Sequence, residues 1–335
     1  MSDKIYFSFL AFLVLLLSSC GNNPLDMDVS TIKTAPVSIQ RFDRDFFALT
    51  PANISSDLPE LKKKYPGFTA LFLHNIVCTL GVNDSSCIPE IIKFVHDKDM
   101  RNAYDECQKV FPDLSGIESQ LTEVFAHHKY YFPEKKLPNI VAMMSGFNYA
   151  MESSTPGIGL EMYLGSKTTF YEMMRIPGYK RFTMRKEFIV TDFVRAWMMK
   201  EYPDKTKSKT LLGEMIYQGK LLYLADALMP DVHDTLKIGF TKKQLEWCNA
   251  HEADVWGHLI ANKFLYSSEL DVIAKFTREG PFTTGFVNVS PARTGIWIGW
   301  NIVRKYMAKF PETKIESLMN EEDTQMILSK SQYKP

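Results

Sequence analysis

An uninterrupted apolar run opens the chain. It covers residues 5–17, follows the basic residue Lys4 and ends at the small polar residues Ser18 and Ser19. Its length is typical of the apolar core of a signal peptide and is too short for a comfortable membrane span. We therefore predict a signal peptide over residues 1–19.

The pattern of a folded protein begins after a polar stretch. Residues 21 to about 37 are polar and irregular, and the globular pattern starts at Ser38. Residues 39–47 alternate partly and predict an early strand that leads into a helix. Residues 56–132 are predicted to be mostly helical, because apolar residues recur there at spacings of three and four. Examples are Ile91, Ile92, Phe94, Val95, Ile117, Leu121, Val124 and Phe125.

A short β-compatible region follows the first helices. Residues 139–150 and 158–164 are strand candidates, and the sequence Thr-Pro-Gly at 155–157 is a turn signal between them. We expect a small sheet here, formed as a hairpin. Helical character returns from about Met184 and continues to the C-terminus.

Two helix starts are well marked in the C-terminal half. Thr241 and Gln244 have the spacing of a capping box, and Leu245, Cys248, Glu252, Val255 and Leu259 then share one face. Ser290 followed by Pro291 has the form of an N-cap with proline at the first helical position.

The helix predicted after Pro291 carries one apolar stripe. Gly295 and Gly299 lie four residues apart in it, which predicts that another element packs close to its backbone. The stripe consists of Ile296, Trp300, Val303, Met307 and Phe310. Together these patterns predict one α+β domain over residues 38–335, predominantly helical with a small sheet.

The composition is that of a neutral globular protein. The chain has 335 residues, of which 45% are hydrophobic, enough for a substantial core. Lysine plus arginine total 39, as do aspartate plus glutamate, and removal of the signal peptide leaves this balance at zero. Charge gives no reason to expect a nucleic-acid partner, and no nucleic-acid-binding motif is present.

Four cysteines follow Cys20, namely Cys78, Cys87, Cys107 and Cys248. Their spacing matches no zinc framework. An oxidising compartment permits a disulfide, for which Cys78 and Cys87 are the closest pair in sequence, and buried free thiols are the equally favoured alternative.

The sequence Leu-Ser-Ser-Cys at 17–20 resembles the lipobox of bacterial lipoproteins. The resemblance implies that Cys20 becomes an acylated N-terminus, a permanent anchor, with residues 20–37 as a lipidated tether. Gly21 stands where an inner-membrane retention signal has aspartate, and residues 21–24 lack an acidic surface-export cluster. We therefore expect the outer membrane, with the protein facing the periplasm.

Histidines offer the most tempting chemistry. His251 and Glu252 begin like the zincin motif His-Glu-x-x-His, but Val255 holds the second histidine position, and His258 lies two turns away, too far for one zinc ion. We expect Glu252 to tether a neighbouring segment instead. The adjacent pair at 127–128 cannot chelate one ion and is predicted to be a solvated helix end. We predict no catalytic residue, no metal and no cofactor besides the lipid on Cys20.

Charged residues among aromatic ones suggest buried ion networks. Arg293 and Arg304 flank the tryptophan-rich helix, while Arg185, Asp192 and Arg195 lie near Trp197. Such networks are more often structural than catalytic.

Several segments together are similar to the gliding-motility lipoprotein family GldB of Bacteroidota, along nearly the whole mature chain. The most specific are the Pro-x-Arg-x-Gly-x-Trp helix at 291–297 and the closing tail at 331–335. The other segments are 143–148, 160–165, 213–223 and 244–256.

The resemblance in turn implies a distantly zincin-like scaffold with a degenerate metal motif. Residues 191–195 occupy the motif position, with Thr191 and Arg195 in place of the histidines and Asp192 in place of the glutamate. Arginine has no lone pair for zinc. Glu214 could descend from a third ligand. Thr191, Asp192, Arg195, Glu214, Glu252 and Arg293 are the candidate vestigial-site or contact residues.

Three function classes follow. The resemblance favours a non-catalytic component of an envelope machine, whose partners are the membrane and other envelope proteins, motility machinery among them. A cryptic zincin-like metallohydrolase is the second class. The third is a ligand- or glycan-binding lipoprotein with a pocket lined by Trp297 and Trp300.

Overall fold

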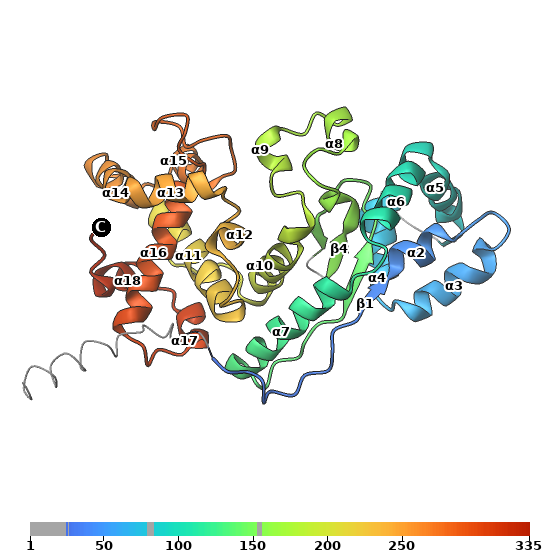
Figure 1. Cartoon of the computed structure of the whole chain (residues 1–335), viewed down its shortest axis with the longest axis horizontal. Helices are drawn as coiled ribbons and strands as arrows, with labels where there is room; N and C mark the ends of the chain where they lie inside the picture. The colour runs from blue at the N-terminus through green and yellow to red at the C-terminus, as the bar shows by residue number, and fades with distance from the viewer. Residues whose placement is uncertain (1–24, 26, 79–83, 153–155) are drawn as a thin grey trace, which may run out of the picture.

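Leu25 and residues 27–78, 84–152 and 156–335 are described in the computed structural model. The predicted signal peptide and Cys20 lie outside the described residues. The sheet and the first helices occupy one end of the molecule, and the last helices occupy the other (Figure 1). The fold is predominantly helical α+β, which confirms the predicted class. In the described part of the chain, no helix is both long and apolar enough to cross a membrane.

A four-stranded sheet has the order β1-β2-β4-β3. The first three of these strands are parallel, and β3 pairs with β4 in the antiparallel direction. The strands are β1 (Ile39–Arg41), β2 (Ile140–Met143), β3 (Met151–Glu152) and β4 (Gly157–Gly159).

The predicted hairpin is wrong, because β2 and β4 are parallel neighbours. The chain leaves the sheet after β2 and wraps around the buried carboxylate of Glu161, which accepts hydrogen bonds from the amides of Ser145 (2.6 Å) and Phe147 (3.1 Å). The short strand β3 then supplies the antiparallel partner of β4. The second strand candidate also ends early, since residues 160–163 form the 3₁₀ helix η2 (Leu160–Tyr163).

The helices before β2 confirm the predicted helical region and the strand that leads into a helix at 39–47. Phe42, Phe46 and Phe72 form the centre of an aromatic cluster, with Phe42 and Phe72 ring centroids 4.8 Å apart. The elements are α2 (Phe42–Phe47), α3 (Ile54–Lys64), α4 (Phe68–Phe72), the π-helix η1 (Leu73–Val77), α5 (Asp84–His96), α6 (Lys98–Val110) and α7 (Ser115–Tyr131).

The histidine pair near the end of α7 is buried, so the prediction that it is solvated is wrong. His127 is 3% exposed and His128 is fully buried, because this turn packs against α10 (Ile189–Glu201). The His128 ring lies 4.5 Å from the Trp197 ring and 5.0 Å from the Phe132 ring. Burial lowers the pKa of His128 to about 4, so this imidazole is neutral at physiological pH.

The remaining helices form the C-terminal half. They are α8 (Thr169–Met173), α9 (Gly178–Arg181), η3 (Lys186–Phe188), α10, α11 (Leu211–Leu228), α12 (Asp234–Ile238), α13 (Lys242–Ala250), α14 (Glu252–Ala261), η4 (Phe264–Tyr266), α15 (Leu270–Thr277), α16 (Thr294–Lys309), α17 (Ile315–Asn320) and α18 (Thr324–Ser331). The predicted continuous face across 245–259 is interrupted at His251, where α13 ends and α14 begins.

Helices α11 and α16 form the tightest contact of this half. Every residue of α11 except Glu214 is buried. A Cβ at Gly299 would overlap the Met215 carbonyl oxygen, and a Cβ at Gly219 would lie 2.8 Å from the Trp300 amide nitrogen. The two backbones therefore touch, which confirms the close packing predicted from the glycines of α16.

One of the two predicted helix starts is confirmed. Thr241 and Gln244 form the capping box at the start of α13. Ser290 and Pro291 do not start a helix, because the Pro291 carbonyl accepts hydrogen bonds from the Thr283 amide (3.0 Å) and hydroxyl (2.8 Å). Helix α16 begins only at Thr294.

The N-terminal strap, which we define as Leu25 and residues 27–38, runs irregularly along the body from the side of α17 to β1 (Figure 1). Leu25 is 9% exposed and belongs to the hydrophobic core. At the other end, the amide of Val37 donates to the Thr122 hydroxyl (2.9 Å) and that of Ile39 to the Glu118 carboxylate (2.8 Å). The described part of the predicted tether is thus held to the folded domain at both of its ends.

Cysteines take both of the predicted states. Cys78 and Cys87 form a disulfide, with Cα atoms 5.9 Å apart. Cys107 and Cys248 are buried free thiols, and burial raises the pKa of each.

Candidate functional site

Arg293 lies at the centre of the candidate site. It is the residue before α16, it is 9% exposed, and its backbone has the left-handed φ of 61°. Its Nη2 donates to the Ile238 carbonyl at 2.6 Å, and its guanidinium lies 5.5 Å from the Phe240 ring centroid. Burial and the charge of Arg195 lower the pKa of Arg293 to about 10, so it stays protonated at physiological pH.

Helix α10 places Asp192 and Arg195 within electrostatic reach of Arg293. The Tyr163 hydroxyl donates to Asp192 Oδ2 at 2.9 Å. Burial raises the pKa of Asp192 to about 6, although the Tyr163 hydrogen bond and the charges of Arg195 and Arg293 oppose the shift. Asp192, Arg195 and Arg293, all singled out from the sequence, are thus brought together, and we call them the arginine centre.

Glu214 connects to the arginine centre through one amide side chain. Arg195 Nη2 donates to Gln218 Oε1 at 3.2 Å, and Gln218 Nε2 donates to Glu214 Oε1 at 3.0 Å. Gln218, one helical turn after Glu214 on α11, is a site residue that the sequence reasoning missed. The i, i+4 spacing was its available signal.

A cleft with a volume of about 260 Å³ lies against Arg293, and we call it the arginine cleft. Gly239 makes room for the guanidinium, since its φ is +74° and a Cβ there would lie 3.1 Å from Arg293 Nη2. The lining comes from the α9 region, the α12–α13 connection and the loop between α15 and α16. It comprises residues 178–180, 182–183, 239–241, 244, 279–280 and 292–293.

The residues at the zincin-like position do not fit a metal site. The Thr191 hydroxyl donates to the Phe188 carbonyl (3.0 Å) within its own helix, and Arg195 offers protons and no lone pair. Nowhere in the described residues do three His, Cys, Asp or Glu side chains come together as metal ligands.

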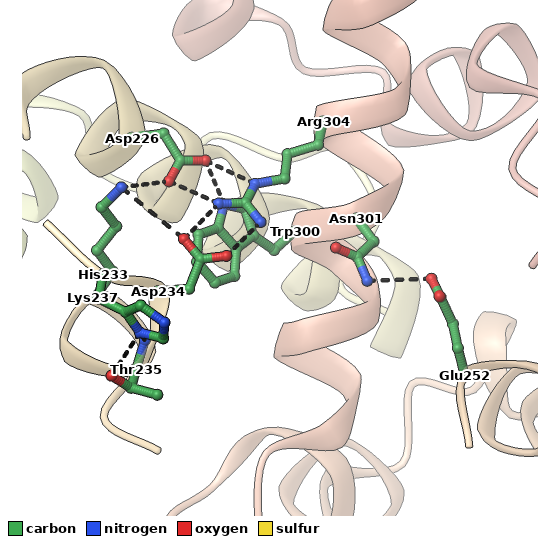
Figure 2. A network of polar contacts seen from close by, with 9 residues as sticks. All are labelled: Asp226, His233, Asp234, Thr235, Lys237, Glu252, Trp300, Asn301 and Arg304. Carbon is green, nitrogen blue, oxygen red and sulfur yellow. Dashed lines mark hydrogen bonds and ion pairs between the residues drawn. The ribbon is translucent and has the colours of Figure 1, made fainter. Parts of the chain in front are cut away.

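Glu252, at the start of α14, contacts α16 and the end of the chain instead of the arginine centre. Its Oε1 accepts hydrogen bonds from the Tyr333 hydroxyl (2.5 Å) and from Asn301 Nδ2 (3.1 Å), the latter drawn in Figure 2. The prediction that Glu252 tethers a neighbouring segment is confirmed, and that segment is the C-terminal tail.

An ion network, buried at Asp226 and Lys237 and partly exposed at Asp234 and Arg304, joins α11, α12 and α16 (Figure 2). Arg304 contacts Asp226 and Asp234, each at 2.8 Å, and Lys237 Nζ lies 3.0 Å from Asp226 Oδ1. Hydrogen bonds to the two carboxylates raise the pKa of Arg304 even though burial opposes this. The sequence predicted a network at Arg304 but missed Asp226, although an acid within the apolar last two turns of α11 was a signal for it.

Trp300 and Arg185 differ from their predicted roles. Trp300 is fully buried and its indole nitrogen donates to Asp226 at 2.9 Å, and Trp297 is 2% exposed, so neither lines a ligand pocket. Arg185 joins no ion network among the described residues: its guanidinium lies over the Phe182 ring at 4.6 Å and its Nε donates to the Phe182 carbonyl.

One comparison with known proteins bears on function. The family model described as "Gliding motility protein GldB" matches residues 22–335, nearly the whole chain, which confirms the resemblance seen in the sequence. No curated protein and no solved structure matches the chain.

Proposed function

Since the chain belongs to the gliding motility protein GldB family, we propose that it is a non-catalytic envelope component of the motility machinery that acts by protein contact. In this proposal the signal peptide is removed and the lipid on Cys20 holds the protein to the outer membrane, facing the periplasm. The donor chemistry of residues 191–195 supports a non-catalytic role, because the cationic Arg195 takes the place of a metal-binding imidazole.

The N-terminal strap supports a defined orientation on the membrane. Cys20 and Leu25 are five residue steps apart in the sequence, which span at most about 18 Å when extended. Leu25 lies with Tyr223 and Ala308 at two adjoining surface hollows near the end of α16. The lipid therefore has to enter the membrane close to this edge, beside α17. Helix α9, which lines the arginine cleft, lies at the opposite edge (Figure 1), so in this proposal the cleft is on the part of the molecule far from the membrane.

Lipidation is tested by metabolic labelling with an alkyne fatty acid and by membrane fractionation. We expect the wild-type chain to carry the label and to sediment with membranes, and Cys20→Ser to lose both. Cys248→Ala, which removes a buried free thiol, is the matched control and should keep both. A labelled or sedimenting Cys20→Ser protein would contradict the anchor.

Contact function is tested by affinity purification from crosslinked envelopes of cells that carry a tagged chain. We expect a reproducible set of envelope proteins beyond the abundant porins, recovered with wild type and not with Cys20→Ser. Recovery of porins alone would contradict the proposal. Stoichiometric zinc in the purified protein, or a peptidase activity that Glu214→Gln abolishes, would favour the hydrolase alternative.

A further inference from the structure

We propose that the arginine cleft binds a carboxylate of a polypeptide partner, supplied by the chain terminus or by an acidic side chain. The inference rests on the proposed function, because it names the chemistry by which one partner is recognised. Arg293 is its centre.

Arg293 is a buried cation whose hydrogen-bonding capacity is largely unused. A guanidinium has five N–H donors, and the Ile238 carbonyl is the acceptor that the described part of the chain provides. Asp192 and Glu279 act on Arg293 through their charges, yet no carboxylate within the described residues lies in ion-pair range of it, 4.0 Å or less. A buried charge without a paired counter-charge is unfavourable. A ligand carboxylate would supply that counter-charge with two parallel hydrogen bonds.

The backbone presents Arg293 to the cleft at a cost in strain. A non-glycine residue at a φ of 61° is uncommon and persists where the surrounding structure enforces it. Here the amides of Ile296 and Trp297 hold the Arg293 carbonyl, at 3.0 and 3.3 Å. The positive end of the α16 dipole adds to the guanidinium charge at this point.

The rest of the cleft favours a polypeptide segment. Its volume of about 260 Å³ admits a short stretch of chain and no folded domain. Lys180, exposed at the rim, adds a second positive charge. Tyr179 lines the same cleft and is 37% exposed, and Phe182 and Phe240 also line it, so apolar surface is available next to the charges. Peptide recognition commonly combines an anchored charge with such apolar contacts.

Glu279 opposes an anion in the same cleft. It is exposed, lines the cleft with Arg293, and acts on both Arg293 and Asp192 through its charge. Neutralising Glu279 should therefore strengthen binding of a carboxylate, whereas neutralising Arg293 should weaken it. A purely structural role for these residues does not predict opposite signs.

The test uses the full-length chain in detergent and two pools of N-acetylated random tetrapeptides. One pool ends in a free carboxylate and the other in an amide, so a terminal carboxylate is distinguished from an acidic side chain. Retained peptides are identified by mass spectrometry, and the best one is labelled for fluorescence anisotropy. We expect every retained peptide to carry a carboxylate, either at its terminus or on aspartate or glutamate.

Each variant of the cleft is expected to change the Kd for that peptide by a different amount. Arg293→Met should weaken binding by about tenfold or more, and Lys180→Glu by about threefold. Glu279→Gln should tighten binding by about twofold. Lys186→Glu makes the same charge change as Lys180→Glu at an exposed position outside the cleft lining, and should leave the Kd unchanged.

Three results would overturn the proposal. They are no retained peptide, retention that does not depend on a carboxylate, and equal effects of Lys180→Glu and Lys186→Glu with no gain in Glu279→Gln. The exposed variants keep the test valid if Arg293→Met does not fold. Each of these results leaves the recovery of envelope partners untouched, so failure of the cleft and failure of the proposed function are separate outcomes.

Discussion

The backbone contact between α11 and α16 predicts that the single methyl group added by Gly299→Ala lowers the stability of the protein substantially. Alanine gains about 1 kcal/mol over glycine in a helix interior. Its Cβ, however, would overlap the Met215 carbonyl oxygen and lie 3.1 Å from the Met215 Cα. Overpacking costs about 1–3 kcal/mol, and more when backbone has to move, as it does here. We expect a net loss of about 2 kcal/mol or more in the free energy of unfolding.

Gly257→Ala is the matched control for that measurement. Gly257 is an exposed position of α14, and a Cβ there would meet nothing within 4 Å. This change should raise stability by about 0.5–1 kcal/mol. Urea unfolding followed by tryptophan fluorescence compares the two variants, since Trp300 is buried in α16. If Gly299→Ala unfolds within about 0.5 kcal/mol of Gly257→Ala, the two backbones do not touch and the packing argument fails.

Three further predictions concern charge and crosslinking. The pKa of Asp192 in the folded protein is raised to about 6, so ionisation of this carboxyl disfavours the folded state. As pH rises from about 4 to about 7.5, the free energy of unfolding of the wild type should therefore fall by up to about 3 kcal/mol relative to that of Asp192→Asn. Stability curves that stay parallel over this pH range would refute the prediction. Arg304→Met leaves the buried Asp226 with Lys237 as its ion-pair partner and the Trp300 indole as a neutral donor. It should cost about 2–4 kcal/mol by urea unfolding, and an unchanged midpoint would be the contrary result. Cys78→Ser should cost about 2–3 kcal/mol, and a reductant should impose the same loss on wild type but none on the variant.

Local signals in the sequence predicted the elements that local chemistry determines. The capping box at Thr241 depends on residues three apart, and the strand before α2 on a few neighbouring side chains. The glycines of α16 predicted close packing, because a missing side chain on an apolar helix needs a partner surface. These features are decided within one or two turns of chain.

The errors concern contacts between distant segments. The parallel register of β2 with β1 pairs Ile140 with Ile39, about a hundred residues earlier, and no local pattern reveals it. Pro291 does not occupy the predicted first helical position, because its carbonyl accepts a hydrogen bond from the Thr283 hydroxyl. The histidine pair at 127–128 was predicted to be solvated, but the surface of α10 covers it.

The sequence predicted which residues belong to the candidate site, but it did not predict how they are arranged. Asp192, Arg195 and Arg293 were chosen as charged residues among aromatic ones, and the fold does gather them. Among the described residues, no carboxylate lies within ion-pair range of Arg293. This depends on how α12 and the loop after α15 pack around the guanidinium, which the spacing of residues along the chain does not reveal.

The N-terminal strap also sets an order of events in time. An exported chain emerges with its N-terminus first, yet Leu25 packs beside Tyr223 and Ala308, and Ile39 pairs with Ile140. The earliest residues to cross the membrane are therefore among the last to find their contacts, since long loops close slowly. For a chain acylated at Cys20, the enzymes that cleave and modify the N-terminus meet it before the strap docks. In the proposed export and acylation, docking of the strap therefore follows the folding of the helices that hold Tyr223 and Ala308.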